Sequence, residues 1–187
     1  MGVVLNMSSN SYKNFTLLLF SFLIVSLSYA GSDRESVDKQ MTPVTYKDWL
    51  IKRKQYVPNI LVVDMWAMWC SSCIERFPEM VKMHDKYKNR GVDFVSMNLD
   101  DREDHQSLKL AEKFLTKMDA DFDHYHMKEN LVYAFEKIDL ISIPAIIIYD
   151  ENGNEIDRLT GDNPNNQFSE EDIELSINKL LNLRVIK

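Results

Sequence analysis

The chain has 187 residues but only two cysteines, Cys70 and Cys73, which are separated by two residues. No further cysteine is present to form a structural disulfide, and a protein that needs disulfides for stability usually carries more of them. A tetrahedral zinc site would need additional thiolates or well-spaced histidines. We therefore interpret the pair as a chemical site rather than as part of the scaffold, and we expect no metal and no cofactor.

The chain also has little positive charge. It contains 22 Lys and Arg residues and 29 Asp and Glu residues, which gives a formal net charge of −7 at pH 7. This balance argues against binding to nucleic acid, which selects basic surfaces, and against electrostatic docking on anionic lipids. The apolar fraction of 45% and the charged fraction of 27% are ordinary for a soluble globular protein. The length fits one domain with an N-terminal extra segment.

Internal repeats and low-complexity tracts are absent, and the N-terminal apolar run over residues 15–27 is short for a membrane-spanning helix. The run follows Lys13 and precedes the small residues Ser28 and Ala30, which predicts a secretory signal over residues 1–30. An uncleaved membrane anchor is the alternative. We expect a polar linker over residues 31–41 and the folded domain over residues 42–187, in the periplasm or otherwise exported, where disulfides persist.

Hydrophobic periodicity predicts an α/β domain with a central mixed sheet flanked by helices. Apolar runs indicate strands, and an Asn-Gly turn indicates a terminal hairpin, at residues 59–65, 92–99, 122–126, 145–150 and 155–160. Apolar spacing indicates helices at residues 45–55, 71–89, 101–118, 128–138 and from 169 onward. In the second helix Ile74, Phe77, Val81 and His84 share one face, and Pro78 is expected to interrupt and kink that helix.

The cysteines stand between a predicted buried strand and a predicted helix. At a helix N-terminus, free backbone N–H groups and the helix dipole favour a thiolate. Such placement lowers a cysteine pKa from about 8.5 into the range of roughly 3.5–7.5. Cys70 is therefore expected to be the exposed nucleophile that attacks a substrate disulfide, and Cys73 the buried thiol that resolves the mixed disulfide.

Two further residues are candidates for the site. Asp64 lies in the middle of an apolar strand, where an ionisable group is expensive to bury unless it is used or paired. We interpret Asp64 as a proton acceptor for Cys73, the alternative being a solvated residue near the strand end. Pro144 stands directly before a predicted strand, where a cis or a trans peptide bond would both be ordinary.

Residues 63–73 read Val-Asp-Met-Trp-Ala-Met-Trp-Cys-Ser-Ser-Cys, with Pro78 five residues later and Ser142-Ile143-Pro144 downstream. This combination resembles the thioredoxin superfamily. The predicted signal segment and the additional region 101–138 resemble its exported branch of TlpA/ResA-like thiol-disulfide oxidoreductases. The resemblance covers roughly residues 44–183 and implies a thioredoxin-like three-layer fold.

The resemblance also implies roles for residues and partners. Pro144 is expected to be cis and to lie beside the sulfur atoms, presenting backbone to an extended substrate segment. The substrate is expected to contact Trp66, Trp69, Ser71, Ser72 and Ile143, with the two tryptophans walling the site. Members of this branch reduce disulfides in exported proteins, including apocytochromes before haem attachment, and a membrane thiol donor recharges them.

The chain departs from the pattern of this branch at three places. The dipeptide Ser71-Ser72 lacks the proline that is common before the second cysteine, so a redox potential does not transfer. Asp64 stands where many exported members carry Asn. Arg76 stands where many carry an acidic residue, and the adjacent Glu75 is expected to be a solvated helix residue.

A copper-binding or copper-delivery protein of the same fold is the alternative function. Such proteins typically space their cysteines by three residues and add a distal histidine, whereas the spacing here is two. His124 and His126 alternate on the predicted strand at 122–126, so both side chains would point to one face, although such pairs are mostly surface residues. His84 is expected to be packed or half-buried. A peroxiredoxin is not expected, because no lone cysteine occurs in the required setting.

Overall fold

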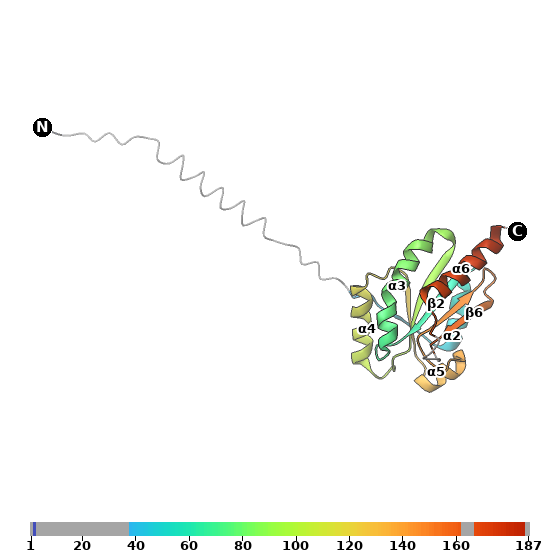
Figure 1. Cartoon of the computed structure of the whole chain (residues 1–187). Helices are drawn as coiled ribbons and strands as arrows, with labels where there is room; N and C mark the ends of the chain where they lie inside the picture. Colours follow the sequence, from blue (N-terminus) through green and yellow to red (C-terminus); the bar gives the residue numbers. More distant parts are fainter. Residues whose placement is uncertain (1, 3–37, 162–166, 186–187) are drawn as a thin grey trace. The chain divides into compact units, whose positions relative to one another are not determined.

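The computed structural model describes Gly2, residues 38–161 and residues 167–185. The predicted signal segment, apart from Gly2, and most of the predicted linker lie outside the described residues. All described helices and strands belong to the unit Val37–Lys187 (Figure 1). Within the described part of the chain, no helix is both long enough and apolar enough to cross a membrane.

A mixed sheet of six strands forms the centre of this unit, in the order β1-β4-β3-β2-β5-β6. The first four strands in this order are parallel to one another. β5 pairs antiparallel with β2, and β6 pairs antiparallel with β5. The strands are β1 (Thr42–Val44), β2 (Ile60–Trp66), β3 (Val92–Asn98), β4 (Asp123–Met127), β5 (Ala145–Tyr149) and β6 (Glu155–Thr160).

Helices cover both faces of the sheet, so the fold has the three layers that were predicted (Figure 1). The helices are α2 (Tyr46–Lys52), α3 (Ser71–Tyr87), α4 (His105–Lys117), α5 (Leu131–Ile138) and α6 (Glu170–Val185), and 3₁₀ turns follow α2 at Arg53–Tyr56 and α3 at Lys88–Arg90. α2 and α5 pack on one face, and α3, α4 and α6 on the other. Because side chains alternate along a strand, even-numbered residues of β2, including Asp64, face α3.

Side-chain capping hydrogen bonds are present at the start of two helices. At α2, the Thr45 hydroxyl accepts from the Asp48 backbone N–H, and the Asp48 carboxylate accepts from the Thr45 backbone N–H. At α6, Ser169 and Asp172 exchange the same pair of bonds. α4 begins four residues later than predicted, because Asp104 acts as its N-cap by accepting from the Ser107 backbone N–H.

Two features of the elements differ from the prediction. β1 was not predicted, and its three residues form an edge strand only because they pair with β4. Pro78 does not end the second helix, since α3 is one helix that contains it, and the kink at Pro78 stays a prediction. The buried face of α3 is also displaced by about one residue from the predicted one and consists of Cys73, Phe77, Met80, Met83 and Tyr87. This apolar packing outweighs the one backbone hydrogen bond that a proline removes.

Candidate active site

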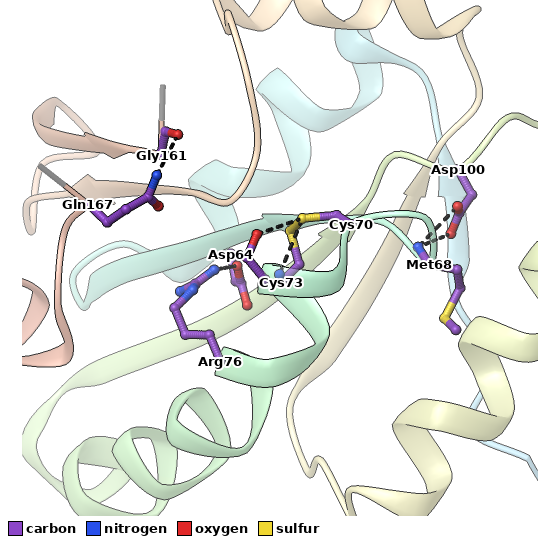
Figure 2. The surroundings of a disulfide bond; sticks show 9 residues. Asp64, Met68, Cys70, Cys73, Arg76, Asp100, Gly161 and Gln167 are labelled. Atoms are coloured by element: carbon purple, nitrogen blue, oxygen red, sulfur yellow. Dashed lines mark hydrogen bonds and ion pairs between the residues drawn. A yellow bond between two sulfur atoms is a disulfide. The ribbon is translucent and has the colours of Figure 1, made fainter. Parts of the chain in front are cut away.

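The two cysteines lie where β2 ends and α3 begins, at the carboxyl edge of the parallel strands (Figure 2). They form a disulfide with an S–S distance of 2.10 Å and a Cα–Cα distance of 5.3 Å. Cys70 is the N-cap of α3, and its Sγ accepts a hydrogen bond of 3.2 Å from the Cys73 backbone N–H. The sulfur of Cys70 therefore occupies the place where unpaired backbone donors and the helix dipole favour negative charge.

The two sulfur-bearing residues differ in exposure. Cys70 is 6% exposed and Cys73 is fully buried. Ser71 and Ser72 are exposed beside them, and the Ser72 hydroxyl lies 3.6 Å from Cys70 Sγ. Trp69, immediately before Cys70, is 57% exposed. The expectation of an exposed Cys70 is therefore wrong for this oxidised form: Cys70 is buried, although it is the more accessible of the two cysteines. The order of attack stays a prediction.

Trp66 is placed differently from Trp69. Its side chain is fully buried, and its ring packs against Phe77 and Phe114 with centroid distances of 5.2 and 5.6 Å. Trp66 and Cys73 belong to one apolar cluster between the end of β2, α3 and α4. Trp66 therefore lies in the core behind the disulfide, where a substrate cannot contact it as expected. Of the two tryptophans, only Trp69 is exposed.

Asp64 is buried beneath α3 and paired with Arg76. The Arg76 Nη2 group donates to Asp64 Oδ1 at 2.6 Å, and the two side chains are 10% and 1% exposed (Figure 2). Burial raises the pKa of the Asp64 carboxyl above its usual range, and the Arg76 guanidinium opposes that rise. The other oxygen, Oδ2, is buried and has no hydrogen-bond partner in the described part of the structure.

Pro144 follows a cis peptide bond, as the resemblance implied, and it is buried at the start of β5. Its carbonyl oxygen accepts from the Gly161 backbone N–H at 2.9 Å, which ties it to the end of β6. A Cβ on Gly161 would lie 3.1 Å from Pro144 Cδ, so a residue without a side chain allows this close approach. Ile143 is partly buried and packs against the cluster that contains both cysteines.

A polar cluster that we did not predict lies at the ends of β3 and β4. Both carboxylate oxygens of Asp100 accept from the Met68 backbone N–H, at 3.1 and 3.0 Å (Figure 2). The Asn98 side chain donates to Asp100 Oδ2 at 2.7 Å, and His126 Nε2 lies 3.1 Å from the Asp100 carbonyl oxygen. Asp100 is 2% exposed, and burial raises the pKa of its carboxyl although these hydrogen bonds oppose the rise. This cluster holds the loop that leads from β2 to Cys70.

His124 and His126 both lie on β4 and are each 6% exposed. His124 Nδ1 pairs with the Ser96 hydroxyl at 2.8 Å and Nε2 with the Ala120 carbonyl oxygen at 3.1 Å. Burial lowers the pKa of His124 to about 4 and also lowers the pKa of His126. The hydrogen bonds to Ser96 and Ala120 occupy both ring nitrogens of His124. Among the described residues, no three His, Cys, Asp or Glu side chains converge on a point that could hold a metal ion.

Glu75 and His84 are two further residues of α3 that the sequence analysis discussed, and neither takes part in the site. Glu75 is exposed on α3. His84, further along α3, is half-buried between the rings of Phe94 and Phe122, at centroid distances of 5.9 and 5.2 Å. His84 is thus the packed histidine that we predicted, and neither residue approaches the disulfide through a contact that the structure records.

A match to a known family model identifies the family of the chain. The model of the AhpC/TSA family matches residues 36–155, which is more than half of the chain. The chain belongs to the AhpC/TSA family. The matched segment contains Asp64, both cysteines, Asp100 and Pro144.

Two curated relatives of the chain carry the same name. The thiol-disulfide oxidoreductase ResA of Bacillus thuringiensis is 22% identical over 120 residues, which are 64% of this chain and 65% of that protein. The protein of the same name from Oceanobacillus iheyensis is 30% identical over 78 residues, 42% of this chain and 38% of that protein. The match therefore spans less than two thirds of the length of these relatives.

Solved structures support the same fold. A putative thiol:disulfide interchange protein DsbE from Chlorobium tepidum has a TM-score of 0.55 at 26% identity, covering 68% of this chain and 83% of that chain. The thioredoxin domain of a thiol-disulfide oxidoreductase from Bacteroides vulgatus has a TM-score of 0.55 at 18% identity, covering 68% and 82%. These similarities confirm the predicted thioredoxin-like fold.

Proposed function

We propose that this chain is a thiol-disulfide oxidoreductase that works outside the cytoplasm and reduces disulfides in other proteins. The observation that carries the proposal is the disulfide between Cys70, at the N-cap of α3, and the buried Cys73. A sulfur at a helix N-terminus is a stabilised thiolate and hence a good nucleophile and leaving group. The names of the curated relatives support this reaction class.

The proposed reaction begins with both cysteines reduced. The Cys70 thiolate attacks one sulfur of a substrate disulfide, which forms a mixed disulfide and releases the other substrate sulfur as a thiolate that takes up a proton. Cys73 then loses its proton and attacks Cys70 Sγ. The Cys70–Cys73 bond forms as the bond to the substrate breaks, so the substrate gains two electrons and leaves as two thiols.

The residues around the sulfurs are proposed to guide this exchange. Trp69, Ser71 and Ser72 are exposed next to Cys70 and would contact an approaching substrate segment. The backbone around Ile143 and Pro144 would lie along that segment. Asp64, whose Oδ2 has no hydrogen-bond partner among the described residues, is the proposed proton acceptor for Cys73.

Partners and location follow from the resemblance and the N-terminal sequence. The proposed substrates are disulfide-containing exported proteins, with apocytochromes c as one class, and the proposed source of electrons is a membrane thiol donor. The apolar run at residues 15–27 supports export, with either a cleaved signal or a membrane tether.

The reaction is tested by insulin reduction in the presence of dithiothreitol. Cys70→Ser should abolish the acceleration given by the wild-type protein, because it removes the attacking sulfur. Cys73→Ser should instead accumulate a mixed disulfide that mass spectrometry detects. Urea unfolding of both variants next to the reduced wild type controls for loss of fold. Full activity of Cys70→Ser would contradict the proposal.

The direction of electron flow and the copper alternative each need a separate measurement. Equilibration with glutathione buffers, followed by trapping of the free thiols, gives the redox potential. A value near the oxidising end of the known range, about −120 mV, would contradict a reductase. Titration of the reduced protein with Cu(I) tests the alternative, which tight binding that depends on His124 or His126 would favour.

A further inference from the structure

The two oxygens of the Asp64 carboxyl group have different surroundings. Oδ1 accepts the 2.6 Å hydrogen bond from Arg76 Nη2. Oδ2 is buried without a hydrogen-bond partner in the described part of the chain. A buried acceptor without a partner is costly in free energy. Its free lone pairs are, however, what a group that takes up a proton needs.

Arg76 is held against Asp64 by its position on α3. It follows Cys73 by three residues, so both side chains lie on the same face of the helix. Figure 2 shows the Asp64 carboxyl group between Arg76 and Cys73, below the disulfide in this view. The Arg76 guanidinium also lies over the ring of Phe168, with its central carbon 5.1 Å from the ring centroid. Since the side chain is only 10% exposed, Asp64 and Phe168 together fix the cation at this place.

Among the described residues, Arg76 is the charged residue that acts on Asp64. Within the sheet, the neighbours of Asp64 are Ser96 on β3 and Ile146 on β5, neither of which carries a charge. His124, one strand beyond Ser96, is neutral near pH 7 because burial lowers its pKa to about 4. On the helices, the groups facing Asp64 are Arg76 and the buried Cys73 of α3. Burial raises the pKa of Asp64, and the attraction and hydrogen bond of Arg76 lower it.

We propose that Arg76 is a positioning residue that sets the acid limit of the second step of the exchange reaction. By stabilising the ionised form of Asp64, it keeps Oδ2 able to accept the Cys73 proton at a lower pH than a buried carboxyl group alone would allow. In this step the Cys73 thiol transfers its proton to Oδ2. The resulting thiolate attacks Cys70 Sγ, the Cys70–Cys73 bond forms, and the substrate sulfur leaves with the electron pair of the broken bond. The inference rests on the proposed function.

The test follows both steps in one experiment. The reduced full chain is mixed with excess dithiobis(nitrobenzoate) in a stopped-flow instrument across a range of pH. Attack by Cys70 releases one coloured thiolate at a rate that depends on the reagent concentration. Resolution by Cys73 releases a second one at a rate that does not. Cys73→Ser should show the first phase only, which assigns the phases.

The variants separate charge from structure. The acid limb is the part of the pH profile in which the second phase slows as the pH falls. In Arg76→Gln this limb should move to higher pH by about one unit or more, as expected when a cation beside a carboxylate is removed. Arg76→Lys should retain most of the wild-type limb, and Asp64→Asn should lose the limb and resolve slowly at every pH. The first phase should keep its pH profile in all three. Lys82→Gln removes a positive charge from the exposed side of the same helix and should leave both phases unchanged.

The outcomes distinguish this inference from the proposed function. A wild-type protein that shows only one phase at every pH overturns both. Two phases with an unshifted acid limb in Arg76→Gln overturn the role of Arg76 alone. If Arg76→Gln does not fold, Arg76→Met, which retains an apolar contact with Phe168, replaces it. An NMR titration of the Asp64 carboxyl carbon in the reduced wild type needs no variant, and a midpoint that differs from that of the acid limb also overturns the proposal.

Discussion

At the scale of single residues, Asp100 has a structural task next to the cysteines. Its carboxylate accepts from the Met68 backbone N–H and from the Asn98 side chain. We expect Asp100→Ala to leave both donors without their acceptor and to lower the free energy of unfolding by about 1–3 kcal/mol. We also expect slower attack by Cys70, because the loop before it loses its anchor. Urea denaturation and the first stopped-flow phase measure the two effects.

Two further variants serve as controls for this prediction. Asp101→Ala changes the exposed neighbour and should be nearly neutral in both measurements. Asp100→Asn keeps one carbonyl acceptor for Met68 and should lie between Asp100→Ala and the wild type. Equal losses of stability in the two alanine variants, or an unchanged rate of Cys70 attack, would exclude the anchoring role.

Residues of the site could be predicted from sequence only where a local motif marks them. Cys70 and Cys73 are recognisable from their spacing, and Asp64 from its place in an apolar run. Arg76 and Asp100 were missed because their partners are distant in the chain: Arg76 bonds to a residue 12 positions away and Asp100 to one 32 positions away. Such pairs arise only when β2, β3 and α3 come together.

At the scale of elements, the strands with continuous apolar runs were predicted within one or two residues. β2 and β5 are buried along their whole length, so their sequences carry an unambiguous pattern. β1 carries no such pattern, since it has three residues, includes Pro43 and has two exposed positions. The buried face of α3 differs from the predicted one because the helix packs against both β2 and α4. The periodicity of a single helix does not reveal these two neighbours.

The connection from α3 to β3 depends on one glycine. Gly91 has a φ of +74°, and a Cβ there would lie 2.8 Å from Arg184 Nη1, which donates to the Gly91 carbonyl oxygen. We expect Gly91→Ala to lower the free energy of unfolding by about 1–2 kcal/mol, from backbone strain and the displaced Arg184. Thermal unfolding measures the loss. Insulin reduction at low temperature should stay at the wild-type rate, because the cysteines lie at the other end of α3.

The matched control for this prediction is Arg184→Ala, which removes the hydrogen bonds of the guanidinium to Gly91 and Pro58 without straining the backbone. If strain dominates, Gly91→Ala should remain destabilising in the Arg184→Ala background. A double variant no less stable than Arg184→Ala alone would show that the contact with Arg184, and not the positive φ, accounts for the effect.

At the scale of the whole molecule, the three layers and the mixed sheet could be predicted because alternating strands and helices leave few arrangements. A polar row across the sheet could not be predicted. Asp64, Ser96 and His124 are register partners on adjacent strands β2, β3 and β4, and all three are buried. The row is visible only once the strand order is known, because β4 follows the helix after β3 and the three residues are far apart in sequence.

This row makes global stability depend on pH through His124. Its pKa is about 4 in the folded protein, against 6.5 for an unperturbed histidine, because burial disfavours the charged ring. Between these values the unfolded chain binds a proton that the folded protein does not, so the free energy of unfolding falls as pH decreases from 6.5 towards 4. The full effect is roughly 3 kcal/mol, and above pH 6.5 the contribution is constant.

His124→Gln should therefore flatten the acid side of the stability curve, measured by urea denaturation at successive pH values from neutral to about 4. Carboxyl groups also destabilise the protein in acid, so the quantity to compare is the difference in slope between variant and wild type. His105→Gln, at the exposed start of α4, removes a histidine without changing the core and should keep the wild-type slope. Equal slopes for all three proteins would mean that His124 takes up its proton as readily in the folded state as in the unfolded chain, and the buried row would then have no part in the acid sensitivity of the fold.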